Sequence, residues 1–238
     1  MIKDIRWHKI LELLKEDHII LVNDIIEKLN LSPTTVRRDL TEMEQQGLIK
    51  RTHGGVKLKE SKEYGFEEQI NQKIQHNAKE KYLIADKAVK LIKDKMSIYL
   101  DAGSSTLALI KLIDPTQKII IITNSILHAE LLTIAGFHDV YLLGGKYKLS
   151  TGALIGWEAI STLQKYNIDL AFLGVNGIDD NELYTTDPEE AMIKAEVIKR
   201  AKQAYVLADQ TKFNHKSLVK FATTNEVEII SANWKKSN

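Results

Sequence analysis

Two threonines and two arginines follow a Ser-Pro pair in the stretch LSPTTVRRDLTEMEQQGLIKRTHGG, residues 31–55. Arginine reads guanine O6 and N7 or grips phosphate, and threonine contacts phosphate or the thymine methyl group, so these residue types suit DNA. The candidates are Thr34, Thr35, Arg37 and Arg38. Lys50, Arg51 and His53 continue the basic character and would lie beside the adjacent DNA backbone.

The positive charge of the chain is concentrated here. Residues 31–59 include six basic and three acidic residues, whereas the others include 27 basic and 29 acidic ones. The net charge of +1 therefore hides a local positive field, as expected of a protein that meets a polyanion with one face. The alternative is that Arg37 and Arg38 only form the solvated face of a surface helix.

Helical spacing predicts how these residues are presented. Ser32 is a good N-cap, and Pro33 suits the first position of a helix. Val36, Leu40 and Met43 follow at i, i+4 and i+7, which makes them the buried side and leaves the threonines and arginines outside.

Further short elements are expected around this helix, and together they predict a winged helix-turn-helix. The expected elements are an apolar helix over residues 6–14, an extended link over 18–22, a helix from Asn23 or Asp24 to Leu29, an end of the recognition helix at Gly47, and a two-stranded wing over 48–58 with Gly54-Gly55 as its turn.

The rest of the chain of 238 residues has a different pattern. Helices alternate with short apolar strands, which predicts a parallel sheet covered on both faces. The predicted strands are residues 97–100, 119–122, 140–143, 169–173, 204–207 and 227–230. The predicted organisation is a DNA-binding domain over residues 1–58, a charged linker over 59–76 and a second domain over 77–238.

Polar loops follow four of these strands, at the edge where such sheets bind ligands. They are DAGSST (101–106), TNS (123–125), GGKY (144–147) and GVNGIDD (174–180). In DAGSST, backbone N–H groups and hydroxyls converge on one point, which suits a phosphate group.

Charged residues lie near these loops in TTDPEEAMIK and LADQTKF. Lysines neutralise phosphate and carboxylates accept sugar hydroxyls, so Lys194, Lys212 and Asp209 suit a phosphorylated polyol. Asp187 stands near a predicted helix N-terminus. The alternative is that Glu190 and Lys194, at i and i+4, form an ordinary exposed pair and that each glycine is only a turn.

The sequence lacks the residues that thiol chemistry, metal binding, serine-nucleophile catalysis and dinucleotide binding require. There is no cysteine, the 7 histidines show no metal-ligand spacing, and neither a Gly-x-Ser-x-Gly elbow nor a dinucleotide fingerprint is present. No apolar run approaches the roughly 18 residues of a membrane span. We therefore expect a soluble, cytoplasmic protein without a metal or a cofactor.

Residues 31–55 resemble the N-terminal signature of the DeoR family of bacterial transcription regulators, in which Ser-x-x-Thr-x-Arg-Arg-Asp-Leu precedes Gly-Leu-x-x-Arg-x-His-Gly-Gly. The similarity continues through DAGSST, TNS, LGGKY, TTDPEEAMIK and LADQTKF and covers nearly the whole chain. It implies an α/β protein with an N-terminal winged helix-turn-helix and a C-terminal Rossmann-like parallel-sheet domain that resembles ribose-5-phosphate isomerase.

The resemblance also implies a function, namely a repressor of a sugar or polyol catabolic operon that a sugar phosphate releases from DNA or retunes on it. We expect a dimer or tetramer, because recognition helices address repeated half-sites. The effector would be held by Asp101, Gly103, Ser104, Ser105, Thr106, Thr123, Asn124, Gly144, Gly145, Lys194, Asp209 and Lys212.

The chain departs from the related isomerases in one informative place. Their Asp-Gly-Ala-Asp-Glu loop supplies catalytic acids, whereas this chain reads VNGIDD with Asn176 before the glycine, which favours sensing over turnover. The Thr-Asp that often follows the last strand in the family is also missing. Two alternatives remain open: an isomerase with an appended nucleic-acid-binding module, and a constitutive DNA-binding protein whose second domain only oligomerises.

Overall fold

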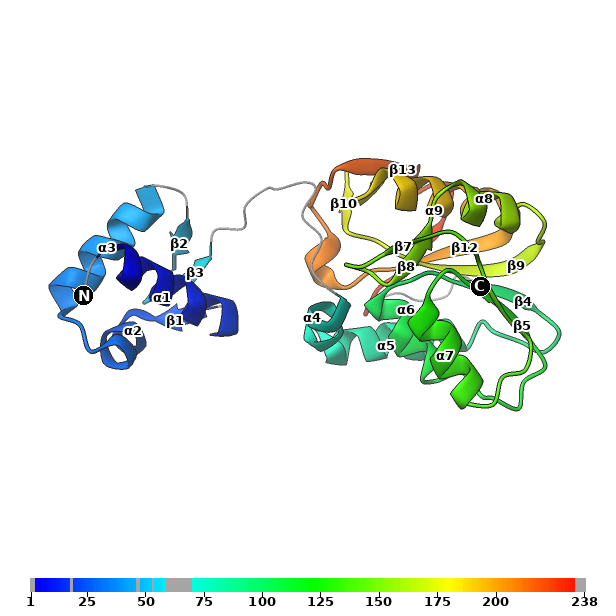
Figure 1. Ribbon diagram of the computed structural model, residues 1–238, viewed down its shortest axis with the longest axis horizontal. Helices are drawn as coiled ribbons and strands as arrows, with labels where there is room; N and C mark the ends of the chain where they lie inside the picture. The colour runs from blue at the N-terminus through cyan, green and yellow to red at the C-terminus, as the bar shows by residue number, and fades with distance from the viewer. Residues whose placement is uncertain (1–2, 18, 46–47, 53, 59–69, 234–238) are drawn as a thin grey trace. The chain divides into compact units, whose positions relative to one another are not determined.

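The computed structural model describes residues 3–17, 19–45, 48–52, 54–58 and 70–233 (Figure 1). The chain divides into two compact units, Met1–Lys62 and Glu63–Asn238, here called the N-terminal and the C-terminal unit. Among the described residues, no helix combines the length and the apolar character needed to cross a bilayer.

The N-terminal unit is the expected winged helix-turn-helix. Its described elements are α1 (Lys3–Asp17), β1 (Ile19–Leu21), α2 (Val22–Leu29), α3 (Pro33–Gln45), β2 (Ile49–Arg51) and β3 (Gly55–Leu58), and the strands form a sheet in the order β1-β3-β2. The link expected over residues 18–22 is thus partly a strand, which extends the two-stranded wing. Ile20 pairs with Val56, and both side chains are buried in the core that the helices share.

The N-terminal cap predicted from the sequence is present in α3 but not in α2. Ser32 caps α3 as predicted, since its Oγ accepts a hydrogen bond from the N–H of Thr35 (3.2 Å). The cap predicted for α2 at Asn23 or Asp24 is wrong, because the helix starts at Val22 directly after β1, and Leu21 precedes it without a side-chain cap.

The wing turn also differs slightly from the prediction. Gly54 has a left-handed φ of +86°, as a turn glycine should, whereas Gly55 already belongs to β3 and pairs with Leu21. Gly47, the predicted end of α3, lies outside the described residues.

Part of the segment expected as a linker is helical. Residues 59–69 lie outside the described residues, but α4 (Ile70–Gln75) falls within the expected range 59–76. The N–H of Ile70 donates to the carbonyl of Ser150 (3.0 Å), so α4 packs as part of the C-terminal unit. A helix of 6 residues is too short to show a clear apolar period in the sequence.

Six parallel strands form the central sheet of the C-terminal unit, as predicted. They are β4 (Ser97–Leu100), β5 (Ile120–Thr123), β6 (Val140–Leu142), β9 (Ile168–Gly174), β12 (Ala201–Leu207) and β14 (Glu228–Ile230). Their order, β14-β12-β9-β4-β5-β6, is the Rossmann order. It reverses between β4 and β9, so the loops after these strands diverge and leave room for a ligand.

Helices cover both faces of this sheet (Figure 1). One face carries α5 (Ala78–Val89), α6 (Ser104–Ile110) and α7 (Ile126–Ile134), and the other carries α8 (Trp157–Leu163) and α9 (Pro188–Arg200). Side chains alternate along β4, so that Ile98 and Leu100 enter one apolar core and Tyr99 enters the other.

Two antiparallel elements of the C-terminal unit were not among the predicted strands. One is a hairpin of β7 (Lys146–Lys148) and β8 (Ala153–Ile155), and the other is a sheet of β10 (Gly177–Asp179), β11 (Glu182–Thr185) and β13 (Val219–Thr223). Gly145 leads into the hairpin with a φ of +130°, and a Cβ there would come within 2.4 Å of the Ile155 carbonyl oxygen. This position therefore requires glycine.

Candidate functional site

The outward face of α3 carries the residues expected to bind DNA. Thr34, Arg37 and Arg38 are exposed, and Thr35 is half-buried. The hydroxyl of Thr35 lies 2.8 Å from that of Ser32, so this threonine also takes part in the start of the helix. The two arginines thus stand clear of the core.

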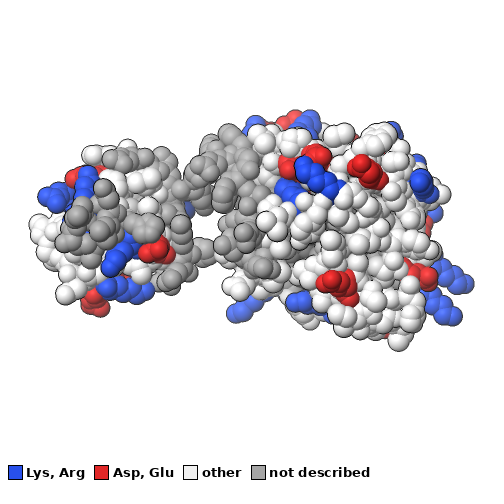
Figure 2. Space-filling view, in the orientation of Figure 1, with Lys and Arg blue, Asp and Glu red and all other residues white. Residues whose placement is uncertain are grey.

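Strand β2 adds basic groups beside α3. Lys50 and Arg51 are exposed, and Nη1 of Arg51 donates to Oγ1 of Thr41 (3.3 Å), one turn beyond Arg37. On the visible face of the N-terminal unit, basic side chains occur with acidic ones between them (Figure 2). His53, the remaining candidate, lies outside the described residues.

A buried ion pair fixes α3 to α1. Nε of Arg6 lies 2.6 Å from Oδ2 of Asp39, and Nη2 lies 2.9 Å from Oδ1. The side chains are 9% and 1% exposed. Burial acts to raise the pKa of Asp39, but the hydrogen bonds and charge of Arg6 outweigh it and hold the pKa below its ordinary value. The sequence patterns did not predict this pair.

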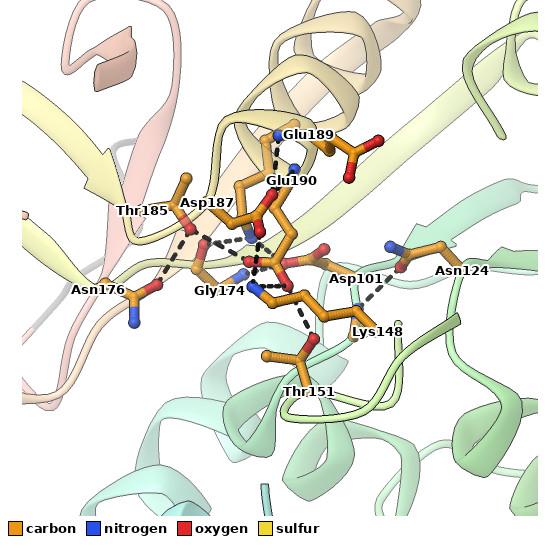
Figure 3. Close-up of polar contacts among 12 residues, drawn as sticks. Asp101, Asn124, Lys148, Thr151, Gly174, Asn176, Thr185, Asp187, Glu189 and Glu190 are labelled. Carbon is orange, nitrogen blue, oxygen red and sulfur yellow. Dashed lines mark hydrogen bonds and ion pairs between the residues drawn. The ribbon is translucent and has the colours of Figure 1, made fainter. Parts of the chain in front are cut away.

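Asp101 and Lys194 form a second buried pair, at the point where the strand order reverses (Figure 3). Oδ2 of Asp101, just after β4, accepts a hydrogen bond from the N–H of Gly174 at the end of β9 (2.9 Å) and contacts Nζ of Lys194. Nζ also donates to the Gly174 carbonyl (3.0 Å). The side chains of the pair are 4% and 6% exposed. Two predicted site residues from distant segments therefore meet.

Two buried side chains beside Asp101 are neutral. Burial first, and then the charges of Asp101 and Glu190, raise the pKa of Tyr99 well above its usual value. The Tyr99 hydroxyl has no hydrogen-bond partner among the described residues. Burial lowers the pKa of His128 to about 4, although Asp101 and the backbone of Gly103 favour its protonated form. Neither neighbour therefore carries a positive charge near neutral pH, and the ammonium of Lys194 contacts Asp101 directly.

The DAGSST loop is shaped by its own hydrogen bonds. Gly103 occupies the N-cap position of α6, and the fully buried Thr106 donates from Oγ1 to the Asp101 carbonyl (2.6 Å). Ser105 is buried and Ser104 is half-buried. The hydroxyl proton of Thr106 is therefore used within the loop.

The neighbouring loops support this one. Oγ1 of Thr123 donates to the Leu100 carbonyl (2.7 Å), and Oδ1 of Asn124 accepts from the N–H of Ala102 (3.0 Å). Nδ2 of Asn124 also donates to the Leu154 carbonyl in β8 (3.3 Å). Thr123 and Asn124 are both buried, so they position the loops and the hairpin. The exposed Gly144 and Gly145 lead into that hairpin.

The loop after β12 lies at the same edge of the sheet, because β12 neighbours β9. Asp209 is buried, and its Oδ1 accepts from the N–H of Thr211 (3.0 Å) and from Nδ2 of Asn77 (3.2 Å). Lys212 is half-buried and ends the short 3-10 helix η1 (Gln210–Lys212), which Asp209 caps.

A further charged cluster adjoins the Asp101–Lys194 pair (Figure 3). Glu190, 8% exposed, accepts hydrogen bonds from the hydroxyls of Thr151 (2.8 Å) and Thr185 (3.3 Å). Nζ of Lys148 lies 3.1 Å from Oε1 of Glu190 and 3.3 Å from Oδ2 of Asp187. Burial acts to raise the pKa of Asp187, but the N–H of Glu190 and the charge of Lys148 hold it below its usual value.

Part of this cluster could not be predicted from the sequence. Lys148 and Thr151 lie in a hairpin that was not predicted, and nothing in their spacing marks them. Asp187 does cap α9, close to where the sequence placed it. The alternative of an exposed pair between Glu190 and Lys194 is wrong, since both side chains are buried and the described ion pairs join each to a residue outside α9.

The VNGIDD loop makes polar contacts of its own. Oδ1 of Asn176 accepts from the hydroxyl of Thr185 (3.2 Å), whereas Asp179 and Asp180 lie 3.4 Å and 3.6 Å from Nζ of Lys216. Within the described ranges, no three histidine or acidic side chains gather as they would around a metal ion.

Two known families match the chain. Residues 6–62 match the family described as "DeoR-like helix-turn-helix domain", and residues 76–232 match "DeoR C terminal sensor domain".

Similar proteins include two bacterial regulators. The "Uncharacterized HTH-type transcriptional regulator FruR" of Bacillus subtilis is 38% identical over 228 residues, which cover 95% of this chain and 89% of FruR. The "Lactose phosphotransferase system repressor" of Lactococcus lactis is 37% identical over 216 residues, covering 90% and 84%. Among solved structures, a ribose 5-phosphate isomerase from Methanocaldococcus jannaschii is similar over 58% of this chain and 55% of its own, with 22% identity and a TM-score of 0.44.

Proposed function

The chain belongs to the DeoR family of transcription regulators, and from this premise we propose that it represses a sugar or polyol catabolic operon and leaves its operator when a phosphorylated sugar binds. The observation that carries the proposal is the outward face of α3. Its arginines are exposed, while Arg6 and Asp39 fix the helix from inside. The name of the Lactococcus relative, a repressor, supports the direction of regulation.

Contacts to operator DNA are proposed for the exposed residues of α3 and the wing. Arg37 and Arg38 would read bases or grip phosphate, and Lys50 and Arg51 would contact the neighbouring backbone. The half-buried Thr35 and the exposed Thr34 at the start of the helix complete the set, together with His53, which lies outside the described residues.

The effector would bind where β4 and β9 diverge. Two features support this: a buried lysine and carboxylate meet there, and the DAGSST loop adjoins them. Asp101 would accept sugar hydroxyls, and Lys194 and Lys212 would contact the phosphate. Ser104, Ser105 and the Gly103 backbone would add donors. Thr106, Thr123, Asn124, Asp209, Gly144 and Gly145 would position the loops around the effector.

Assembly into a homo-oligomer is proposed on symmetry grounds, since recognition helices address repeated half-sites. Large apolar side chains on the C-terminal unit support it, because Trp157 is 68% exposed, Tyr82 55% and Leu83 52%. A protein that acts on chromosomal DNA works in the bacterial cytoplasm.

Sensing is favoured over isomerase turnover. The acids that follow Asn176 pair with Lys216 rather than joining Asp101. If the chain were an isomerase, the purified protein would interconvert sugar phosphates and Lys194→Ala would abolish that activity. We expect no turnover above the rate of a protein-free control.

A gel shift tests the proposal. The full chain is bound to DNA from upstream of its own and neighbouring genes and is titrated with phosphorylated tagatose, fructose, galactitol and deoxyribose. One compound should weaken operator binding by roughly 5–150-fold, which corresponds to the usual allosteric coupling free energy of about 1–3 kcal/mol. Binding that no compound in the panel changes would favour a constitutive DNA-binding protein.

A further inference from the structure

The β7–β8 hairpin contacts both the candidate effector site and the start of α4. On one side, Lys148 and Thr151 reach Glu190 (Figure 3). At its tip, the Ser150 carbonyl accepts the N–H of Ile70 (3.0 Å), and Ile70 is the first described residue after the segment that joins the two units. The hairpin therefore bridges the sensor site and the point where the chain arrives from the DNA-binding unit.

The inner contacts of the hairpin are partly buried, unlike its outer ones. The side chain of Lys148 is 14% exposed, and its partners Asp187 and Glu190 are 25% and 9% exposed. Lys146 on the same strand pairs with Glu189 at 3.1 Å, but these side chains are 70% and 41% exposed. An exposed pair of this kind contributes little, whereas a buried lysine depends on its carboxylates.

The tip of the hairpin borders a groove at the surface. A groove of about 400 Å³ is lined by Ile70, Leu127, Tyr147 and Leu149, among others. The Leu149 side chain is 81% exposed. The exposed Leu149 therefore does not anchor the tip, which is held by the contacts of Lys148 and Thr151 to Glu190 and by the hydrogen bond between Ile70 and Ser150.

We propose that effector binding acts on α4 through this hairpin, and that Lys148 is the latch, meaning the residue whose ion pairs hold the hairpin in place. The inference rests on the proposed function. The ammonium of Lys148 is shared by two carboxylates, Asp187 and Glu190. The hydroxyls of a sugar phosphate bound beside Asp101 compete with Lys148 and Thr151 as donors to Glu190. This exchange weakens the contacts that hold the hairpin, and Ile70 follows through its hydrogen bond to Ser150.

Two variants of the full chain test this role. Lys148→Met removes the latching charge but keeps the length of the side chain, and Lys146→Met removes the exposed charge two residues earlier as the matched control. Three quantities are measured: operator binding, its response to the four sugar phosphates, and effector binding by calorimetry. Hydrogen exchange without effector adds a readout that needs no ligand.

We expect the effector affinity of Lys148→Met to stay within about threefold of the wild type. The effect of the effector on operator binding should fall by about nine-tenths in this variant, while Lys146→Met behaves as the wild type. In hydrogen exchange, Lys148→Met should raise the rate at Ile70 and in residues 146–155 by about tenfold. If Lys148→Met does not fold, Thr151→Val replaces it. The same changes in operator response and hydrogen exchange are expected, but they should be smaller.

Two results would overturn the role. A normal operator response shows that no latch is needed, and a complete loss of effector binding makes Lys148 a direct ligand instead. If no sugar phosphate changes operator binding by the wild type, the proposed function fails. Hydrogen exchange then still tests whether Lys148 controls the hairpin and Ile70. Unchanged exchange at Ile70 in Lys148→Met then contradicts the latch, and faster exchange supports it.

Discussion

Each unit of this protein contains a buried ion pair, and the two pairs stand in opposite relation to function. Arg6 and Asp39 lie inside the N-terminal unit, while the residues proposed to read DNA point away from them. Asp101 and Lys194 lie at the reversal point of the sheet and are themselves the proposed ligands. One pair supports the proposed DNA-binding surface, and the other belongs to the proposed effector site.

The physics of buried pairs explains why this difference matters. Removing one partner leaves an uncompensated charge and is costly, but replacing both with apolar or neutral groups of similar size is often neutral for stability. A supporting pair can therefore be exchanged as a unit without loss of function, whereas a pair that contacts the ligand cannot.

The largest effect is expected from breaking the supporting pair. Asp39→Ala leaves Arg6 buried without its carboxylate, so the free energy of unfolding of the N-terminal unit should fall by about 3–5 kcal/mol. Thermal denaturation of the full chain, followed by operator binding at the same temperature, measures it. The joint change Arg6→Met with Asp39→Leu should restore most of the stability and the operator binding. If the joint variant folds but no longer binds, the pair has a direct role in DNA binding.

A smaller effect is expected at the surface that this pair supports. Arg38→Ala should cost about 1–3 kcal/mol of operator affinity if the guanidinium reads a base, with no change in melting temperature. Lys9→Ala, an exposed charge on α1, is the control. Footprinting on operator and on mixed-sequence DNA measures the difference, and an unchanged footprint at low protein concentration would remove Arg38 from the reading surface.

The smallest effect is expected in the wing. Lys50→Ala should weaken binding to operator and to unrelated DNA alike and reduce the salt dependence by about one charge, because a phosphate contact carries no sequence information. Fluorescence anisotropy over a range of salt concentrations measures the slope. Loss of preference for the operator would instead mean that Lys50 contacts a base.

The sequence predicted the central sheet because its six strands are short apolar runs separated by helices. It also predicted that Asp101 and Lys194 belong to one site, although they are 93 positions apart. The parallel arrangement brings the carboxyl ends of the strands to one edge, which is why loop composition was informative.

Other features left weaker signals in the sequence. Asp39 stands three residues after Val36 and so belongs to the buried side of α3, but a charged residue next to two arginines resembles an ordinary surface charge in the sequence. Lys148 and Thr151 depend on a hairpin of two three-residue strands, which has no distinctive period. Their partner Glu190 could be placed on a helix, but its burial depends on tertiary packing.

The central claim is that the Asp101–Lys194 pair senses the effector, and its joint exchange tests this most directly. Operator binding by Asp101→Asn with Lys194→Met is titrated with the sugar phosphate that releases the wild type. We predict operator affinity within about threefold of the wild type and no release, against a wild-type effect of roughly 5–150-fold. Normal release of the double variant would contradict the account.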